Sequence, residues 1–393
     1  MNPKIKNTVA VNKLYKMPFS GKNIPHAVIE VNQKCNISCK ACYKDQSDYT
    51  KPLEIIKNEI DFIITKRNLH LITLAGGEPT LHPELSEVIK YISNKGILVD
   101  VLSNGFALTD KKLAEYKKSK INKIFLHIDE HQKRPDLKEN FDRKDLIELR
   151  TNISNKIIKN GIRCALEITL YKSDLANFSE FISCFFNNKM HQSLLVTCCT
   201  DFELIANNIP KSSILPNRLV PTILDNEVVL NEEVIAYLNH QFNLLPYGYI
   251  PSTKNISEKR WIFYLTFVIQ LKNCKTKLLH TNIDFKHIAK VGNQLHIKKT
   301  GKYPFDIIWN KKKIFYKCLL YALFSLNPLT IMKTILFLSN LLKPGSTLNF
   351  KTMIFQQGPN VTYDGEIEYC LNCPDVTIKD NKLIPVCLAD VLK

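Results

Sequence analysis

Short β-rich runs alternate with segments of helical period over residues 27 to about 200, and this alternation constrains the fold most. The runs expected as strands are 27–31, 71–75, 98–102, 123–128, 164–170 and 194–197. The expected helices, with apolar residues at helical spacing, are 53–66, 83–94, 110–119, 145–160 and 174–187. This order is typical of βα units on a parallel sheet that curls into an open or closed barrel. Ligands of such folds lie at the carboxyl ends of the strands.

Residues at the ends of the expected helices support this assignment. Thr109 and Ser173 are expected N-caps, because a hydroxyl can accept a hydrogen bond from the first helical turn. Gly96 and Gly161 are expected helix ends, because glycine adopts the left-handed backbone there without strain.

The rest of the chain divides by composition. With 393 residues, 45% of them hydrophobic, the chain can bury a full core, which excludes a disordered or fibrous protein. We expect a lead-in, the α/β barrel, a connector with prolines and a helix, a basic apolar helical region and a cysteine-rich metal-binding segment. Their bounds are 1–26, 27–205, 206–253, 254–351 and 352–393, and the connector helix is expected at 231–243.

The positive charge is concentrated in the fourth part. Residues 254–351 hold 18 Lys/Arg against 3 Asp/Glu and supply most of the net charge of +17. Such asymmetry indicates a surface that faces a membrane, a nucleic acid or a phosphorylated substrate.

The same region holds two apolar runs, 261–271 and 314–342, and neither reaches the ~20 uninterrupted apolar residues of a transmembrane helix. A helical hairpin bent at Pro328 and flanked by Lys311, Lys312, Lys313 and Lys343 would suit the interface of an anionic membrane. The alternative is a pair of ordinary buried helices with lysines at their ends.

Three cysteines, Cys35, Cys39 and Cys42, stand on a loop directly after the first expected strand. Three thiolates can bind three irons of a cubane cluster and leave the fourth iron open for a substrate. A zinc knuckle short of one ligand is the alternative. The loop's position at the ligand-binding end of a barrel favours a catalytic site.

A second loop follows the second expected strand with the sequence Gly76-Gly77-Glu78-Pro79. Two glycines let the backbone approach a ligand closely, and a carboxylate beside carbonyl groups suits an ammonium. Taken alone, the turn could also be a strand-to-helix corner.

Together, the Cys-x3-Cys-x2-Cys loop and the Gly-Gly-Glu turn resemble the radical SAM superfamily over residues 27 to 200. The resemblance implies a partial (β/α)6 TIM-like barrel, a [4Fe–4S] cluster on the three cysteines and S-adenosylmethionine (SAM) on the open iron. It implies that Gly76, Gly77, Glu78 and Pro79 receive the methionine amino group. It further implies SAM contacts from Ser103, Asn104 and Asp129. Many relatives have an aromatic residue or histidine that packs on the adenine of SAM where this chain has Ala41, and the resemblance implies that Tyr43 partly replaces this contact.

A second cysteine group lies near the end of the chain, at Cys370, Cys373 and Cys387. We expect a knuckle and a β-hairpin, turning at Asp380-Asn381, to bring the three thiols together. The group resembles an incomplete SPASM/twitch-like extension, which implies an auxiliary Fe–S cluster, and zinc is the alternative. The candidates for a fourth ligand are Cys274, Cys318, the Cys198-Cys199 pair, a histidine or the substrate.

Three polar residues at the end of the fourth expected strand and in the segment after it are candidates for the substrate pocket, namely His127, His131 and Arg134. A charged surface loop is the alternative interpretation of this segment.

The resemblance implies that an external donor of flavodoxin or ferredoxin type reduces the cluster, and that a 5′-deoxyadenosyl radical then takes hydrogen from a substrate. We expect a lipid or membrane-associated substrate; a ribosomally made peptide and RNA are the alternatives, and DNA binding is not expected. An alternative of another class is a non-catalytic, basic zinc protein. Since no apolar stretch follows Met1, we expect a cytoplasmic protein, peripheral at the inner face of the membrane.

Overall fold

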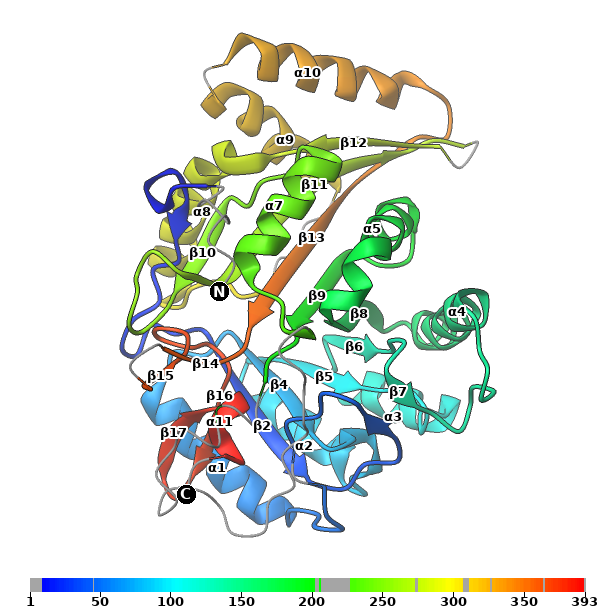
Figure 1. The fold of residues 1–393 in the computed structure, drawn as a ribbon, viewed down its shortest axis with the longest axis vertical. Helices are drawn as coiled ribbons and strands as arrows, with labels where there is room; N and C mark the ends of the chain where they lie inside the picture. The colour runs from blue at the N-terminus through cyan, green and yellow to red at the C-terminus, as the bar shows by residue number, and fades with distance from the viewer. Residues whose placement is uncertain are drawn as a thin grey trace.

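The computed structural model describes residues 9–44, 46–201, 205, 227–272, 275–306, 311–325, 327–362 and 365–391. Figure 1 shows the fold. Residues 206–226 of the expected connector and Cys274 lie outside the described residues.

Six parallel strands of the described residues form the barrel in the order β9-β8-β6-β5-β4-β2. Their bounds are His26–Asn32 (β2), Leu71–Gly76 (β4), Leu98–Ser103 (β5), Lys123–His127 (β6), Arg163–Leu170 (β8) and Ser193–Cys198 (β9). All neighbouring pairs are parallel, which confirms the expected βα order. Their carboxyl ends therefore meet at one end of the barrel.

Helices follow these strands and cover the outside of the barrel, as Figure 1 shows. They are Leu53–Lys66 (α1), Leu85–Asn94 (α2), Asp110–Lys118 (α3), Arg143–Lys159 (α4) and Phe178–Asn187 (α5). The strands bury Val, Ile and Leu side chains against the apolar faces of these helices. Short 3-10 turns lie at Val11–Lys13, Pro79–Leu81, Lys172–Asn177, Asn282–Asp284 and Asn340–Leu342.

The expected helix boundaries hold at three of four positions. The Thr109 side chain caps α3 by accepting from the backbone N–H of Lys112. Gly96 and Gly161 have φ of 71° and 72°, the left-handed conformation that ends a helix. The N-cap prediction for Ser173 was wrong, because its hydroxyl donates to Glu227 and the helix begins only at Phe178.

The sheet continues past β9 with strands from the last third of the chain. Thr347–Gln357 (β13) is parallel to β9, and Lys259–Gln270 (β11) is antiparallel to β13. Further out lie Gly248–Pro251 (β10), Thr276–His280 (β12) and Tyr15–Lys16 (β1). Asn231–Phe242 (α7) confirms the expected helix and ends at Asn243, which has φ of 52°.

The expectation of a helical region over 254–351 was therefore wrong for β11 and β12. Every residue of β11 is buried, and its run of aromatic and β-branched side chains pairs with strands on both sides. A short run that is apolar on both faces fits a central strand as well as a buried helix. The helices of this region are Phe285–Thr300 (α8), Lys311–Ser325 (α9) and Pro328–Ser339 (α10).

The hairpin bent at Pro328 is present, since α9 packs against α10, which starts at that proline. Only one side of α9 is buried, at Ile314, Cys318 and Tyr321, so the alternative of two ordinary buried helices was wrong. Among the described residues, none of the helices combines the length and apolar content needed to cross a membrane.

The C-terminal segment lies beside β2 and α1 (Figure 1). Its hairpin consists of Val376–Lys379 (β16) and Lys382–Pro385 (β17), followed by Val386–Ala389 (α11). Asp380 and Asn381 have φ of 48° and 58°, which confirms the expected turn. Asn360–Val361 (β14) and Ile367–Glu368 (β15) form a small separate pair.

Arg67, at the end of α1, fastens this segment to the barrel. Its buried guanidinium donates to the carbonyls of His26, Pro374 and Cys373 at 2.6, 3.0 and 2.9 Å. Burial lowers the pKa of Arg67 to about 10, while the neighbouring thiols and Asp375 oppose this shift. One side chain therefore satisfies buried carbonyls of β2 and of the cysteine segment together.

We predict that Arg67→Ala lowers the free energy of unfolding by about 2–4 kcal/mol, because buried carbonyls lose charge-assisted donors. Urea unfolding would measure the loss. Lys66→Ala, an exposed neighbour, is the control. Equal stability of the two variants would contradict this role for Arg67.

Candidate active site

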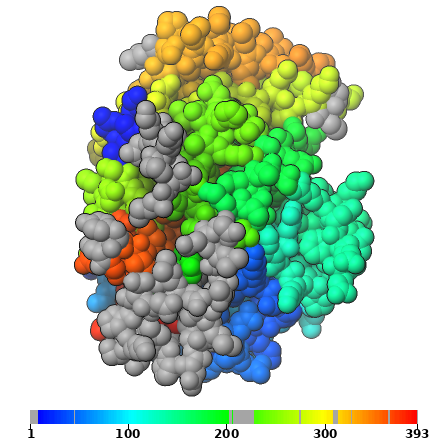
Figure 2. All heavy atoms as spheres, in the orientation of Figure 1, coloured from blue at the N-terminus to red at the C-terminus, as the bar shows by residue number. Residues whose placement is uncertain are grey.

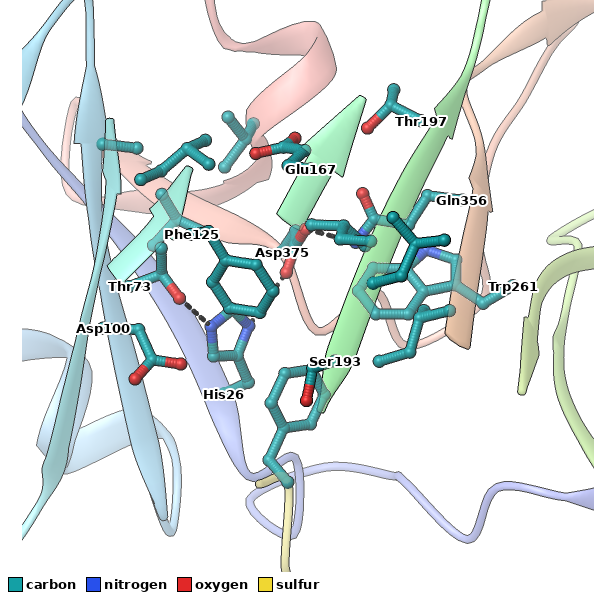
Figure 3. Close-up of a pocket in the computed structure, with 18 of the residues that line it drawn as sticks. His26, Thr73, Asp100, Phe125, Glu167, Ser193, Thr197, Trp261, Gln356 and Asp375 are labelled. Atoms are coloured by element: carbon teal, nitrogen blue, oxygen red, sulfur yellow. Dashed lines mark hydrogen bonds and ion pairs between the residues drawn. The ribbon is translucent and has the colours of Figure 1, made fainter. Parts of the chain in front are cut away.

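A cavity of about 640 Å³ occupies the inside of the barrel. Figure 3 shows side chains from several strands pointing into it, among them Thr73 (β4), Phe125 (β6), Glu167 (β8) and Trp261 (β11). The lining also includes the loops at the carboxyl ends of the strands. The expected ligand-binding end is therefore hollow.

The cysteine loop leaves β2 and forms one wall of the cavity, which Cys35, Cys39 and Cys42 all line. The loop is held by a short antiparallel pairing of Ser38–Cys39 (β3) with Gln132–Lys133 (β7). The backbone N–H of Lys40 also donates to His131 O at 3.0 Å. The segment after β6 thus supports the cysteine loop from behind.

The Gly76-Gly77 turn packs on the backbone that leads into Cys35. A Cβ on Gly76 would lie 2.2 Å from Asn32 O, and one on Gly77 would lie 2.2 Å from Lys34 O. The N–H of Gly77 donates to Asn32 O at 3.1 Å, and that of Glu78 donates to Lys34 O at 2.8 Å. The glycines are needed for this contact between two loops, in addition to any contact with a ligand.

The buried carboxylate of Glu78 joins its own loop to the loop after β5. Its Oε1 accepts from Thr80 N, Thr80 Oγ1 and Ser103 Oγ at 3.1, 2.5 and 2.8 Å. Its Oε2 accepts from Asn104 N at 2.8 Å. A carboxylate oxygen can accept two hydrogen bonds, and Asn104 N supplies one of them to Oε2. Because Glu78 lines the cavity, Oε2 can accept the second bond from an ammonium.

The other predicted SAM contacts differ in position. Ser103, Asn104 and Tyr43 line the cavity, whereas Pro79 and Asp129 do not. The carboxylate of Asp129 accepts from the backbone N–H groups of His131 and Thr169, at 3.0 and 3.2 Å, and lies 2.9 Å from His127 Nε2.

Of the three substrate-pocket candidates, His127 lines the cavity and the other two do not. Burial opposes the charged form of His127, but the bond to Asp129 and the nearby Glu167 raise its pKa above the ordinary value. His131 lies 3.0 Å from Asp174, and Arg134 donates two bonds to Asp136, both at 2.9 Å.

Burial raises the pKa of the Cys35 and Cys39 thiols, and the carboxylates of Glu78 and Asp129 respectively add to the shift. Among the described residues, no group of three His, Cys, Asp or Glu side chains is placed to hold a single metal ion. A cubane cluster makes a different demand, since each thiolate bonds to its own iron. Three thiols on one loop, facing one cavity, fit that donor set.

The C-terminal thiols face the same cavity, since Cys370, Cys373 and Cys387 all line it. Cys370 and Cys373 are buried. The contact with the Cys370 thiol, then burial, raises the pKa of Cys373 well above its ordinary value, and Cys387 adds to the shift. This nearness agrees with the expected gathering of the three thiols. Of the suggested fourth ligands, Cys198 and Cys199 line the cavity and Cys318 does not.

One polar chain inside the barrel was missed from the sequence. His26 lies 2.9 Å from Thr73 Oγ1 and 2.8 Å from Asp375 Oδ1, and Gln356 donates to Asp375 Oδ2 at 3.0 Å. Figure 3 shows Asp375 between His26 of β2 and Gln356 of β13. The C-terminal segment therefore bridges the first barrel strand to the added sheet. No local sequence signal could have revealed this bridge, because its members come from four distant segments.

Residues 29–182 match the family described as the Radical SAM superfamily. The chain carries a radical SAM domain. This confirms the resemblance found from the cysteine and glycine motifs. It also confirms a [4Fe–4S] cluster and SAM as the cofactors that such a domain implies, while the ligand role of each residue stays a prediction.

Similar proteins include enzymes of different specificity. An S-adenosylmethionine-dependent nucleotide dehydratase of a Thermoplasmatales archaeon (strain ISO4-H5) is 26% identical over 40% of this chain and 56% of its own length. The antilisterial bacteriocin subtilosin biosynthesis protein AlbA of Bacillus subtilis is 32% identical over 26% of this chain and 23% of its own. The chain thus spans 56% or less of these two relatives.

Among solved structures, SuiB of Streptococcus suis bound to the precursor peptide SuiA is similar, with a TM-score of 0.41 and 14% identity. The similarity covers 56% of this chain and 47% of SuiB.

We predict that Gly77→Ala lowers the iron bound after anaerobic reconstitution of this radical SAM domain at least severalfold, because a Cβ displaces the backbone before Cys35. Iron and sulfide analysis measures this. In the control Gly292→Ala, the added Cβ has as its nearest atom Lys317 Nζ at 3.7 Å, an ordinary contact. Full iron loading of Gly77→Ala would contradict the packing argument.

We predict that the buried carboxyl group of Glu167 makes the stability of the protein depend on pH. Burial raises its pKa from 4.5 to about 7. The unfolded chain therefore releases this proton at lower pH than the folded chain, so stability falls as pH rises from about 4.5 to 7. Relative to Glu167→Gln, the wild-type protein should lose roughly 2–3 kcal/mol between pH 5 and 8. Urea unfolding at both values tests this, and a pH-independent difference would refute it.

Proposed function

We propose that this chain is a radical SAM enzyme that holds a [4Fe–4S] cluster on Cys35, Cys39 and Cys42 and binds SAM beside it. The observation that carries the proposal is the contact between two loops. The Gly76-Gly77 turn is hydrogen-bonded to the backbone leading into Cys35, and both loops face one cavity. This contact keeps the thiols at a fixed distance from Glu78.

The residues around Glu78 suit the amino-acid end of SAM. Its Oε2 can accept a bond from an ammonium, and the Ser103 hydroxyl and Asn104 N–H hold the carboxylate in place. Asn104 Nδ2 donates to Asn36 Oδ1 at 2.8 Å and lies 3.9 Å from Cys35 Sγ. Asn104 thereby ties the SAM-binding turn to the cysteine loop.

When bound and reduced by an external donor of flavodoxin or ferredoxin type, the cluster and SAM supply a 5′-deoxyadenosyl radical that abstracts hydrogen from a substrate. The protein must position the substrate and exclude water. Side chains of β4, β6, β8 and β11 do this by enclosing the cavity below the loops.

His127 is proposed as a polar contact at the upper end of this enclosure. Its Nε2 lies 2.9 Å from Asp129 and 3.4 Å from Thr169 Oγ1. Because Asp129 favours the protonated ring, His127 can hold a proton that is shared with a substrate oxygen. Asp129 then acts as a positioning residue, rather than by touching SAM.

The C-terminal thiols are proposed to hold an auxiliary Fe–S cluster, with zinc as the alternative that the test below distinguishes. Support comes from their place on the same cavity. Tyr43 packs against the apolar clusters that include Val386 and Leu388, and Lys44 lies 2.7 Å from Glu30 and 2.6 Å from Asp390. The end of the first cysteine loop is therefore fastened to the second cysteine segment.

The similar proteins include a nucleotide dehydratase and a bacteriocin biosynthesis protein. These leave the substrate of this chain open among chemically different classes. We propose a membrane-associated substrate, because the basic region carries an exposed apolar surface.

We predict that the triple variant Cys35→Ala/Cys39→Ala/Cys42→Ala forms no 5′-deoxyadenosine under dithionite and loses about half of the bound iron. Cys370→Ala/Cys373→Ala/Cys387→Ala should lose the other half and still form 5′-deoxyadenosine from SAM. Anaerobic metal analysis and chromatography measure both, and Cys184→Ala, an exposed thiol of α5, is the control. Zinc without iron in the wild-type protein, or no 5′-deoxyadenosine, would contradict the proposal.

A further inference from the structure

The cavity has a second end, far from the cysteine loop. Below the barrel strands it reaches Phe305 and Asp306, and it continues to Gly292 and His296 of α8 and to Lys317 of α9. Asp306 is fastened to the barrel floor at 3.1 Å from Lys123 and 2.7 Å from Arg163. The same cavity therefore joins the SAM-binding loops to the helical region.

This second end is positively charged. Lys317 is half-buried, has no carboxylate partner among the described residues, and burial lowers its pKa. Lys313, one turn away, also lines the cavity and is exposed. Burial and then the neighbouring His296 lower the pKa of His70 to about 4, although Asp306 opposes this shift. A bound anion would relieve the cost of burying Lys317.

The outer face of α9 and α10 is apolar. Leu323 and Ile335 are 64% and 61% exposed, whereas Ile314 and Phe337 on the inner side are buried. The other large apolar side chains exposed on these helices are Phe315, Tyr316, Leu319, Leu320, Phe324, Leu329, Met332 and Leu336. Figures 1 and 2 show the two helices together at one end of the molecule. An exposed apolar surface of this extent marks an interaction site.

The charges around this face specify its partner. The sequence has no Asp or Glu from residue 311 to residue 351. Lys312, Lys333 and Lys343 are exposed on or beside the two helices. A second copy of the chain would bring lysines against lysines in a symmetric pair. An anionic bilayer instead offers hydrocarbon to the apolar side chains and phosphate to the lysines.

We propose that the outer face of α9–α10 binds an anionic lipid membrane, and that the cavity end at Lys317 receives the anionic headgroup of an amphiphilic substrate. The lipid tail would stay near α9, while the headgroup enters toward the barrel. This inference rests on the proposed function for the reactive end of the cavity. Membrane binding itself requires neither the cluster nor SAM.

The first test is co-sedimentation with vesicles of phosphatidylcholine alone and of phosphatidylcholine mixed with phosphatidylglycerol. The wild-type protein should bind the mixed vesicles and be released as salt rises. Leu323→Glu/Ile335→Glu should weaken binding at least about tenfold, because two inserted side chains are lost. The matched control is Ile147→Glu/Ile256→Glu, which changes residues 48% and 62% exposed elsewhere.

Three outcomes would overturn the membrane proposal. They are no retention on mixed vesicles at low salt, equal retention on phosphatidylcholine alone, and a dimer in sedimentation velocity that the Leu323→Glu/Ile335→Glu variant dissolves. Formation of 5′-deoxyadenosine without vesicle binding would sink this inference and leave the radical SAM function intact.

The second test is calorimetric titration with a short-chain phosphatidylglycerol below its micelle-forming concentration. Lys317→Ala should weaken binding about tenfold, since a charge-assisted contact is lost. Lys298→Ala, exposed on α8, should leave binding unchanged. Equal effects of the two variants, or equally tight binding of inorganic phosphate, would contradict a headgroup site for an amphiphile.

Discussion

The contact between the Gly76-Gly77 turn and the backbone of Asn32–Lys34 is the constraint on which the rest of the site depends. A Cβ at either glycine would lie 2.2 Å from a carbonyl oxygen, so the two loops can meet only where side chains are absent. Their contact sets the cysteine loop beside Glu78. Through Ser103 and Asn104, Glu78 then joins the third loop to the first two. Three neighbouring strand ends become one rigid wall of the cavity.

Much of this part could be predicted from the sequence. The six barrel strands are short runs between turn residues, and their order along the chain is their order in the sheet, so local patterns suffice. The sequence pattern wrongly predicted a helix for β11. A run of residues that is buried on both faces shows no hydrophobic periodicity, so a strand cannot be distinguished from a helix there. His131 and Arg134 do not line the cavity, because their segment pairs with the cysteine loop across a long stretch of chain, and their role as substrate contacts stays a prediction. The bridge from His26 to Asp375 has no sequence signature, because only the closed arrangement brings its members together.

The additions to the barrel determine what its cavity can do. The C-terminal segment, fastened by Arg67 and Asp375, closes the side of the barrel beside β2 and adds three thiols to the lining. The helical region extends the other end of the cavity toward a basic, apolar surface. In the proposed function, the loops of the radical SAM domain form the reactive end of this cavity, and the end lined by α8 and α9 receives the substrate. Residues outside the common domain would then select the substrate.

The most direct test of the account is electron paramagnetic resonance of the dithionite-reduced Cys370→Ala/Cys373→Ala/Cys387→Ala variant, with and without SAM. We predict the signal of a reduced [4Fe–4S] cluster whose shape changes when SAM binds the open iron, and a loss of that change in the additional Glu78→Ala variant. A cluster signal that SAM leaves unaltered, or no cluster signal in a protein that retains Cys35, Cys39 and Cys42, would contradict the assignment of this site.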